Sequence, residues 1–243
     1  GIDHREIHHP NEIAQNQAHE CSAHPGAAIW MHNNFLIDRG GKMSKSAGEF
    51  LRLQLLVDRG YHPLAYRLMC LQAHYRSELE FSWEGLQAAL VRLKRMVMGV
   101  EKLGDARGQA SPTVPSQGTI ARAYFERFGE AVSEDLNTAA ALTAFDEMLA
   151  DKRIDANQKA DLVLLLDAVL GIGLISLSRT DLRLRPKAAT IAEAEIEAAL
   201  AARKEARAAK DFIRSDALRD DLAAKGVEVM DGDPLGWDWK LEA

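Results

Sequence analysis

Two lysines on one short segment carry the clearest chemistry in the sequence. Lys42 and Lys45 stand on either side of Met43 and Ser44, are followed by Ser46, and come directly after two glycines. Two ammonium groups on one loop can meet the negative charge that builds on a leaving pyrophosphate. The segment therefore predicts a nucleotide-handling loop, and the alternative is a solvated turn rich in lysine and serine.

A histidine and a carboxylate form a second candidate site. His8 and Glu12 are four positions apart where a helix is expected to begin, so both side chains can point to one side. Imidazole nitrogen and carboxylate oxygen are both acceptable zinc ligands. Taken alone, the same spacing is more often a hydrogen bond on a helix surface, and the residues by themselves leave both interpretations open.

Composition limits the classes of protein to consider. The 243 residues are 47% hydrophobic and carry a net charge of −6, which argues against an indiscriminate nucleic-acid binder. The two cysteines do not form a disulfide framework, which is typical of a reducing compartment. No apolar run is long enough for a membrane span and the first ten residues are too polar for a signal peptide, so we expect a cytoplasmic protein.

The elements that would position these residues begin with a helix over 11–21, just after Pro10. A strand is expected over 29–37 and a turn over 38–41, which delivers the chain into residues 42–46. From residue 51 the apolar period becomes helical, and residues 104–118 have the composition of a linker. The expected helices span 53–59, 63–74, 83–103, 119–131, 138–150 and 156–171, with Leu86, Leu90, Leu93, Val97 and Val100 on one stripe and Thr138 and Asp155 as N-caps.

The last part of the sequence predicts a small separate module. Thr190 and Glu193 have the spacing of a capping box, and the helix they open should continue to about residue 210. A second helix is expected over 211–225 with Gly226 as its stop. A strand pair over 227–230 and 237–240 closes the sequence.

Several short strings occur together in an order that identifies a family. The K-M-S-K-S string is the signature of class I aminoacyl-tRNA synthetases, and its neighbours make the chain resemble the C-terminal half of a cysteinyl-tRNA synthetase. The resemblance covers essentially the whole chain. The strings are H-H-P-N-E-I-A-Q from His8, W-M-H-N from Trp30, A-H-Y-R-S from Ala73, D-L-N-T from Asp135, and Pro234-x-Gly236 with Trp239.

The resemblance implies a mainly α fold in four parts. Residues 1–50 would be the end of a Rossmann-type class I catalytic domain, and residues 51–104 a helical stem-contact region. A helical bundle over 105–189 would lead to a small helical anticodon-binding module over 190–243.

The resemblance also assigns roles to residues. Lys42 and Lys45 would be catalytic, residues 42–46 would bind ATP together with Asp3 near the ribose, and His32 would lie at the amino-acid pocket, whereas Trp30 is expected in the core. His8 and Glu12 would be two of four zinc ligands, with both cysteine ligands upstream of this chain. Zinc binds a thiolate far better than a hydroxyl and so selects cysteine without editing. Pro10 stands where the family usually has Glu, which stiffens the helix start, and neither Cys21 nor Cys70 is expected to replace a ligand.

Basic residues near the C-terminus are expected to contact tRNA. Arg203, Arg207, Lys210 and Arg214 could follow a phosphate backbone, as could the arginines of the polar stretch 176–187. On charge alone, a salt-bridged surface helix fits as well, because acidic residues alternate with the basic ones. The resemblance favours tRNA.

The implied function is ATP-dependent ligation of cysteine to tRNA(Cys) through cysteinyl-adenylate, with Mg²⁺ accompanying ATP, by a monomer. The chain has no H-x-G-H tetrapeptide, so alone it should not activate cysteine. One alternative is a cysteine–amino-sugar ligase of thiol biosynthesis, although the module beyond Thr190 has no use there. The other is a stand-alone tRNA-binding fragment, which the retained signature loop disfavours.

Overall fold

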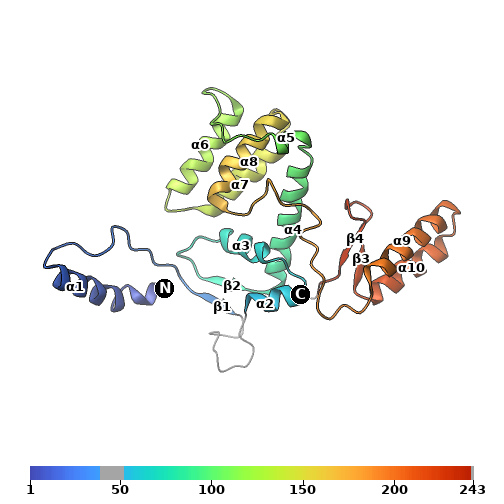
Figure 1. Ribbon diagram of the computed structural model, residues 1–243, viewed down its shortest axis with the longest axis horizontal. Helices are drawn as coiled ribbons and strands as arrows, with labels where there is room; N and C mark the ends of the chain where they lie inside the picture. Colours follow the sequence, from blue (N-terminus) through green and yellow to red (C-terminus); the bar gives the residue numbers. More distant parts are fainter. Residues whose placement is uncertain (39–51, 242–243) are drawn as a thin grey trace.

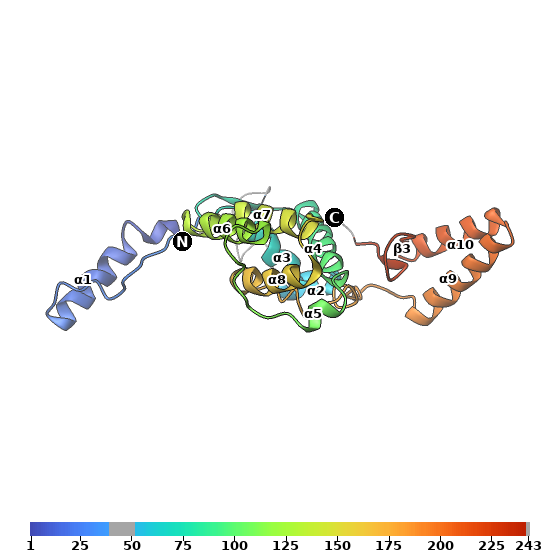
Figure 2. The same cartoon turned by 90° about the horizontal axis from the view of Figure 1, so that it is seen from above.

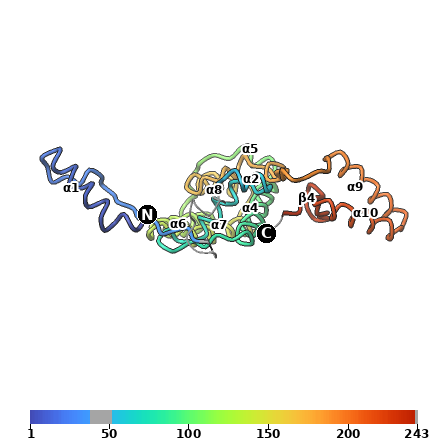
Figure 3. The backbone as a smooth tube through the Cα atoms, turned by 90° about the horizontal axis from the view of Figure 1, so that it is seen from below, coloured from blue at the N-terminus to red at the C-terminus, as the bar shows by residue number. Residues whose placement is uncertain are grey.

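The structure, a computed structural model, describes residues 1–38 and 52–241 as three parts in a row. An N-terminal arm lies at one end, a helical body in the middle, and a small module at the other end (Figure 1). Views turned by 90° show the same extended arrangement (Figures 2 and 3). The described chain is mainly helical, as predicted, and the loop at residues 42–46 lies outside the described residues.

The arm contains a 3₁₀ turn, η1 (Ile2–His4), and helix α1 (His8–Glu20), which starts three residues earlier than predicted. Of the predicted strand 29–37, only its end is a strand, β1 (Leu36–Asp38). It pairs in parallel with β2 (Leu79–Phe81). The prediction of a long strand is wrong because β2 offers only three residues, and no other strand in the described ranges pairs with residues 29–35.

Three helices follow β1: α2 (Leu53–Asp58) and α3 (Pro63–Leu71), and α4 (Trp83–Glu101), which runs from α2 at the bottom of the body in Figure 1 up to its top. The Ser82 hydroxyl caps α4 by accepting the Gly85 N–H at 3.0 Å. The apolar stripe predicted for this helix is confirmed, since all five of its members are fully buried.

The upper half of the body consists of α5 (Asp105–Gly108), α6 (Ile120–Ser133), α7 (Thr138–Ala150) and α8 (Ala156–Leu170). The N-cap prediction for Asp155 is confirmed, because its carboxylate accepts the Gln158 N–H at 2.9 Å. The one for Thr138 is wrong. Left-handed backbone at Asp135 and Leu136 (φ 50° and 56°) turns the chain so that Asn137 becomes the cap, accepting the Ala140 N–H at 3.1 Å.

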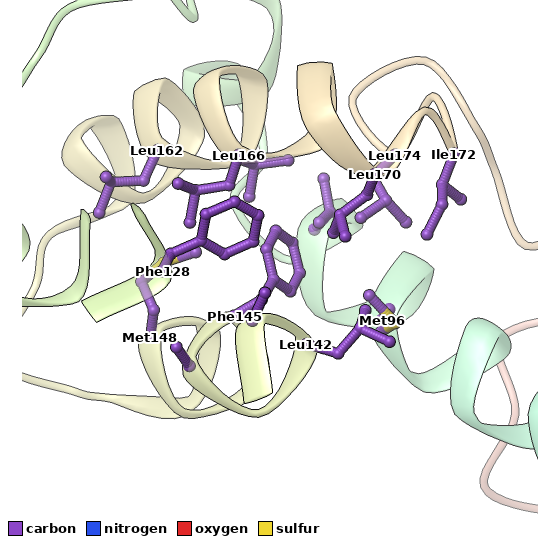
Figure 4. Packing of buried hydrophobic residues seen from close by; sticks show 14 of the residues in the cluster. Met96, Phe128, Leu142, Phe145, Met148, Leu162, Leu166, Leu170, Ile172 and Leu174 are labelled. Carbon is purple, nitrogen blue, oxygen red and sulfur yellow. The ribbon is translucent and has the colours of Figure 1, made fainter. Parts of the chain in front are cut away.

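One apolar core joins both halves of the body. Figure 4 shows Phe128, Phe145 and Leu166 meeting in its centre, where α6, α7 and α8 face one another. Met96 of α4 belongs to the same cluster. Burial of each such side chain contributes about 1.5–3 kcal/mol. Residues on both sides of residue 104 therefore share a core, and the division of the chain at that point stays a proposal.

The C-terminal module has a core of its own. It consists of α9 (Glu193–Ala208), α10 (Phe212–Ala224) and the antiparallel pair β3 (Val227–Val229) and β4 (Trp237–Trp239), which confirms the predicted strand pair. The module's buried apolar residues are Ile191, Ile196, Leu222, Val227, Trp237 and Trp239.

The predicted capping box at the start of α9 is wrong by two residues. Thr190 is not the cap; Ala192 is, and its N–H donates to the Glu195 carboxylate at 3.2 Å. None of the helices in the described ranges combines the length and the apolar character needed to cross a bilayer.

Candidate functional site

Four histidines gather where α1 begins. The His9 ring centre lies 5.8 Å from that of His4, 5.5 Å from that of His8 and 4.8 Å from that of His32. The early start of α1 brings this cluster together, since it places His8 and His9 in the first helical turn. Sequence reasoning assigned no role to His4, although its position four residues before His8 is the signal that could have revealed it.

The closest contact in the cluster joins two elements. His9 Nδ1 and His32 Nε2 are 2.7 Å apart, so one ring donates a hydrogen bond to the other. Burial lowers the pKa of His9, and His32 lowers it further by repelling the charged form. Trp30 packs on His9 at 4.7 Å between ring centres. The prediction that Trp30 belongs to the core is wrong, because it is only half-buried and joins no core cluster among the described residues.

His8 and Glu12 have the geometry of an open metal half-site. His8 Nε2 and Glu12 Oε2 are 3.8 Å apart, too far for a hydrogen bond, so neither atom satisfies the other. Ligand atoms of His8, His9 and Glu12 lie within 4.8 Å of one another. Both predicted ligands are exposed, with nitrogen and oxygen donors of the kind that zinc accepts. These residues fit a zinc ion as part of a larger ligand set.

Among the described residues, neither cysteine belongs to the group of potential ligands at the start of α1. Cys21 follows the last residue of α1, so it lies about 20 Å from His8 along the helix axis at 1.5 Å per residue. Cys70 belongs to α3, where burial raises the pKa of its thiol. The expectation that neither cysteine acts as a ligand agrees with these positions.

The other predicted site residues divide into two groups. Asp3 lies on η1, just before the cluster, and its carboxylate is exposed. Lys42, Met43, Ser44, Lys45 and Ser46 lie outside the described residues.

Hydrogen bonds connect the segment that leads into β1 with the turn before α7, through the loop that precedes β2. The Tyr75 hydroxyl donates to Asp135 Oδ1 at 2.7 Å, and Arg76 Nε lies 2.7 Å from Asp135 Oδ2. Asn34 donates two hydrogen bonds to the backbone of the same loop. Its N–H donates to the Tyr75 carbonyl at 2.9 Å, and its side-chain amide donates to the Arg76 carbonyl at 3.1 Å. Residues just before β1 are thereby connected to the turn that starts α7.

The four predicted tRNA contacts differ in their surroundings. Arg203 donates to Asp231 at 2.9 Å and its side chain is only 11% exposed, while Arg207 reaches the same carboxylate at 3.2 Å. Lys210 and Arg214 are exposed, and no side-chain partner within the described ranges pairs with either. The salt-bridged interpretation therefore holds for Arg203 and Arg207, and two cations stay open to an anion.

Comparison with known proteins gives matches at both ends of the chain. Residues 1–91 match the family of tRNA synthetases class I (C) catalytic domain, and residues 192–234 match the cysteinyl-tRNA ligase anticodon binding domain. These ranges contain the histidine cluster and the basic residues of the module, respectively.

Curated relatives match along nearly the whole chain. A cysteine–tRNA ligase of Novosphingobium aromaticivorans is 65% identical over 99% of this chain and 50% of its own length. One of Zymomonas mobilis is 45% identical over 100% of this chain and 52% of its own length. One of Burkholderia lata is 40% identical over 95% of this chain and 45% of its own length. The chain thus spans about half the length of the curated relatives it matches. With both family domains in sequence order, it belongs to the cysteinyl-tRNA synthetase family, of which it represents the C-terminal half.

Proposed function

We propose that this chain is part of an enzyme that ligates cysteine to tRNA(Cys) at the expense of ATP. One observation carries the proposal: the residues of a class I (C) catalytic domain and of a cysteinyl-tRNA ligase anticodon binding domain occur in one chain. An amino-sugar ligase has no need of the second domain. The proteins similar to this chain are themselves named cysteine–tRNA ligases, which supports the same choice.

The proposed reaction has two steps. The cysteine carboxylate attacks the α-phosphorus of ATP and pyrophosphate leaves, and then a terminal hydroxyl of tRNA attacks the carbonyl and AMP leaves. Lys42 and Lys45 would stabilise the charge on the leaving pyrophosphate. Met43, Ser44 and Ser46 would contribute to ATP binding on the same loop. Asp3 would accept hydrogen bonds from the ribose hydroxyls.

The histidine cluster would select the amino acid. His8 and Glu12 would hold zinc, whose affinity for a thiolate over a hydroxyl separates cysteine from serine. His32, held by its 2.7 Å hydrogen bond to His9, would face the bound amino acid in a fixed orientation. The chain's own donors fill only part of a tetrahedral zinc site, so we infer that the fragment alone does not activate cysteine. Lys210 and Arg214 would contact the anticodon end of the tRNA, whereas Arg203 and Arg207 would remain paired with Asp231.

Aminoacylation of tRNA(Cys) by the full-length protein tests this proposal. Wild-type protein should charge the tRNA with cysteine, and the Lys45→Ala variant should lose this activity. Glu12→Gln should lower the zinc content measured by mass spectrometry, with Glu20→Gln at the far end of α1 as the matched control. Full charging activity in the Lys45→Ala variant would contradict the proposal.

A further inference from the structure

A buried group of four charges lies where the C-terminal module meets the body. Arg179, in the segment between α8 and α9, is 1% exposed, and its Nε donates to Asp233 Oδ2 at 2.9 Å. Its Nη2 donates to Asp238, which also accepts from Lys94 of α4. The two aspartate side chains are 4% and 5% exposed. Two cations and two carboxylates thus form one connected buried cluster, and the expectation that Arg179 follows a phosphate backbone is wrong.

The cluster connects three separate pieces of chain. Lys94 belongs to α4, Arg179 to the connecting segment, and Asp233 and Asp238 to the β3–β4 hairpin of the module. The Arg179 backbone N–H also donates to Glu101 Oε1 at 3.0 Å, two helical turns beyond Lys94 on α4. Arg179 therefore fixes the hairpin to one end of one helix by both its main chain and its side chain.

Other hydrogen bonds at the junction run through the connecting segment: the Lys187 N–H donates to the Asp58 carbonyl at 2.8 Å, and Arg183 Nη1 donates to the Trp237 carbonyl at 3.4 Å. The module buries its own apolar core, and the body buries another, with Leu241 as a partly buried residue that packs on both sides. Apolar contact is non-directional, whereas a guanidinium presents its donors in a rigid planar fork. Buried ion clusters add little stability compared with apolar side chains of the same size, but they can specify one arrangement among several.

The N-terminal end of α4 lies within residues 1–91, the range that matches the class I catalytic domain. The helix starts directly after β2, which pairs with β1, and its 19 residues span about 28 Å. A single rigid element thus joins the strand pair of the catalytic domain to the cluster that holds the module.

We propose that Arg179 is a positioning residue for tRNA recognition, which sets the module's orientation on α4 through Asp233 and Asp238. This inference rests on the proposed ligase function. Arg179 touches neither the histidine cluster nor any predicted nucleotide-binding residue among the described ranges, so amino-acid activation should not need it.

Steady-state kinetics of the full-length protein test the inference. In Arg179→Met, the KM for tRNA should rise about tenfold, while kcat and cysteine-dependent exchange of pyrophosphate into ATP stay within about twofold. Arg179→Lys should recover part of the effect, because an ammonium can reach one carboxylate but lacks the fork. Arg122→Met is the matched control, since Arg122 pairs at 2.7 Å with Glu126 inside one helix, α6.

A second variant covers the case in which Arg179→Met fails to fold because it leaves two buried carboxylates short of a partner. The quadruple change Lys94→Met, Arg179→Met, Asp233→Asn and Asp238→Asn removes all four charges together and should give the same rise in KM. A wild-type KM in the folded quadruple variant, a parallel loss of pyrophosphate exchange and tRNA charging, or failure of both variants to fold would each overturn the inference. Absence of cysteine-dependent exchange in the wild-type protein would instead overturn the proposed function.

Discussion

The Tyr75 hydroxyl and the Asp135 carboxylate are joined by a 2.7 Å hydrogen bond across 60 residues of sequence. Asp135 adopts a left-handed backbone conformation (φ 50°), and Arg76 and His74 lie against the same carboxylate. Donors from one loop therefore hold a strained turn in place. The loop before β2 and the turn before α7 are connected at this point.

The first prediction concerns the charge on Asp135. Hydrogen bonds from Tyr75 and Arg76 hold its pKa below the usual 3.8. Because the folded-state pKa is depressed, the carboxylate contributes stability above pH 3.8, and this contribution is lost as the pH falls through the folded value. Asp135→Asn should lower the urea midpoint at neutral pH, and the gap to the wild type should narrow on acidification. A gap that stays constant down to pH 3 would contradict it.

The second prediction concerns the histidine that caps α3. His62 Nδ1 accepts the Leu64 N–H at 3.2 Å, and burial lowers the pKa of His62 below 6.5, against an opposing effect of Asp181. The folded state thus favours the neutral ring. Stability from this group is complete above pH 6.5 and falls as the pH drops towards the lower folded value.

His62→Asn keeps an acceptor that does not titrate. We expect the variant to lose the part of the pH dependence of the urea midpoint that lies just below pH 6.5. His19→Asn, at an exposed position in the last turn of α1, is the control and should keep the wild-type dependence. If the urea midpoint depended on pH equally in both variants, titration of the His62 cap would be ruled out.

The pattern of apolar residues was enough to predict the helices of the body, and particular residues explain where it failed. The apolar stripe on α4 is a pattern that repeats over 19 residues, so an error in the predicted end of the helix does not change which residues face the core. A cap depends on a single dihedral angle. The left-handed Leu136 moved the cap of α7 from Thr138 to Asn137, and no pattern in the sequence announces such an angle in a leucine.

The candidate site was predictable only where its members are close in sequence. The spacing of His8 and Glu12 on one helix turn predicted their proximity. The His9–His32 contact spans 23 residues and depends on an irregular segment that was expected to be a strand. Burial of Arg179 was equally hidden, because its partners Asp233 and Asp238 lie more than 50 residues away.

The third prediction separates two glycines with the same backbone conformation. Gly60 (φ 87°) ends α2, and a Cβ there would lie 2.8 Å from Leu241, 2.9 Å from Pro186 and 3.1 Å from the Leu184 carbonyl oxygen. Gly226 (φ 80°) ends α10, and a Cβ there would meet nothing within 4 Å among the described residues.

Alanine at Gly226 should therefore cost about 1 kcal/mol of unfolding free energy, the penalty of a left-handed residue. Alanine at Gly60 should cost that amount and roughly 1–3 kcal/mol more, since the backbone at Leu184 must shift. Urea unfolding of both variants gives the comparison. Equal losses of unfolding free energy in the two variants would mean that the segment around Pro186 moves to accommodate the added Cβ without a free-energy penalty.

The last prediction assigns different roles to the basic residues of the module. Lys210 and Arg214 are exposed and unpaired within the described part of the chain, whereas Arg203 is 11% exposed and bound to Asp231. Each cation that neutralises a phosphate releases counterions, so its removal lowers the slope of log K against log salt concentration by about one. Lys210→Ala and Arg214→Ala should each reduce this slope for tRNA binding to the full-length protein. Arg203→Ala should leave the slope unchanged and lower the melting temperature instead, because Asp231 loses its buried partner; a reduced slope in Arg203→Ala would mean that the ion pair opens to bind phosphate.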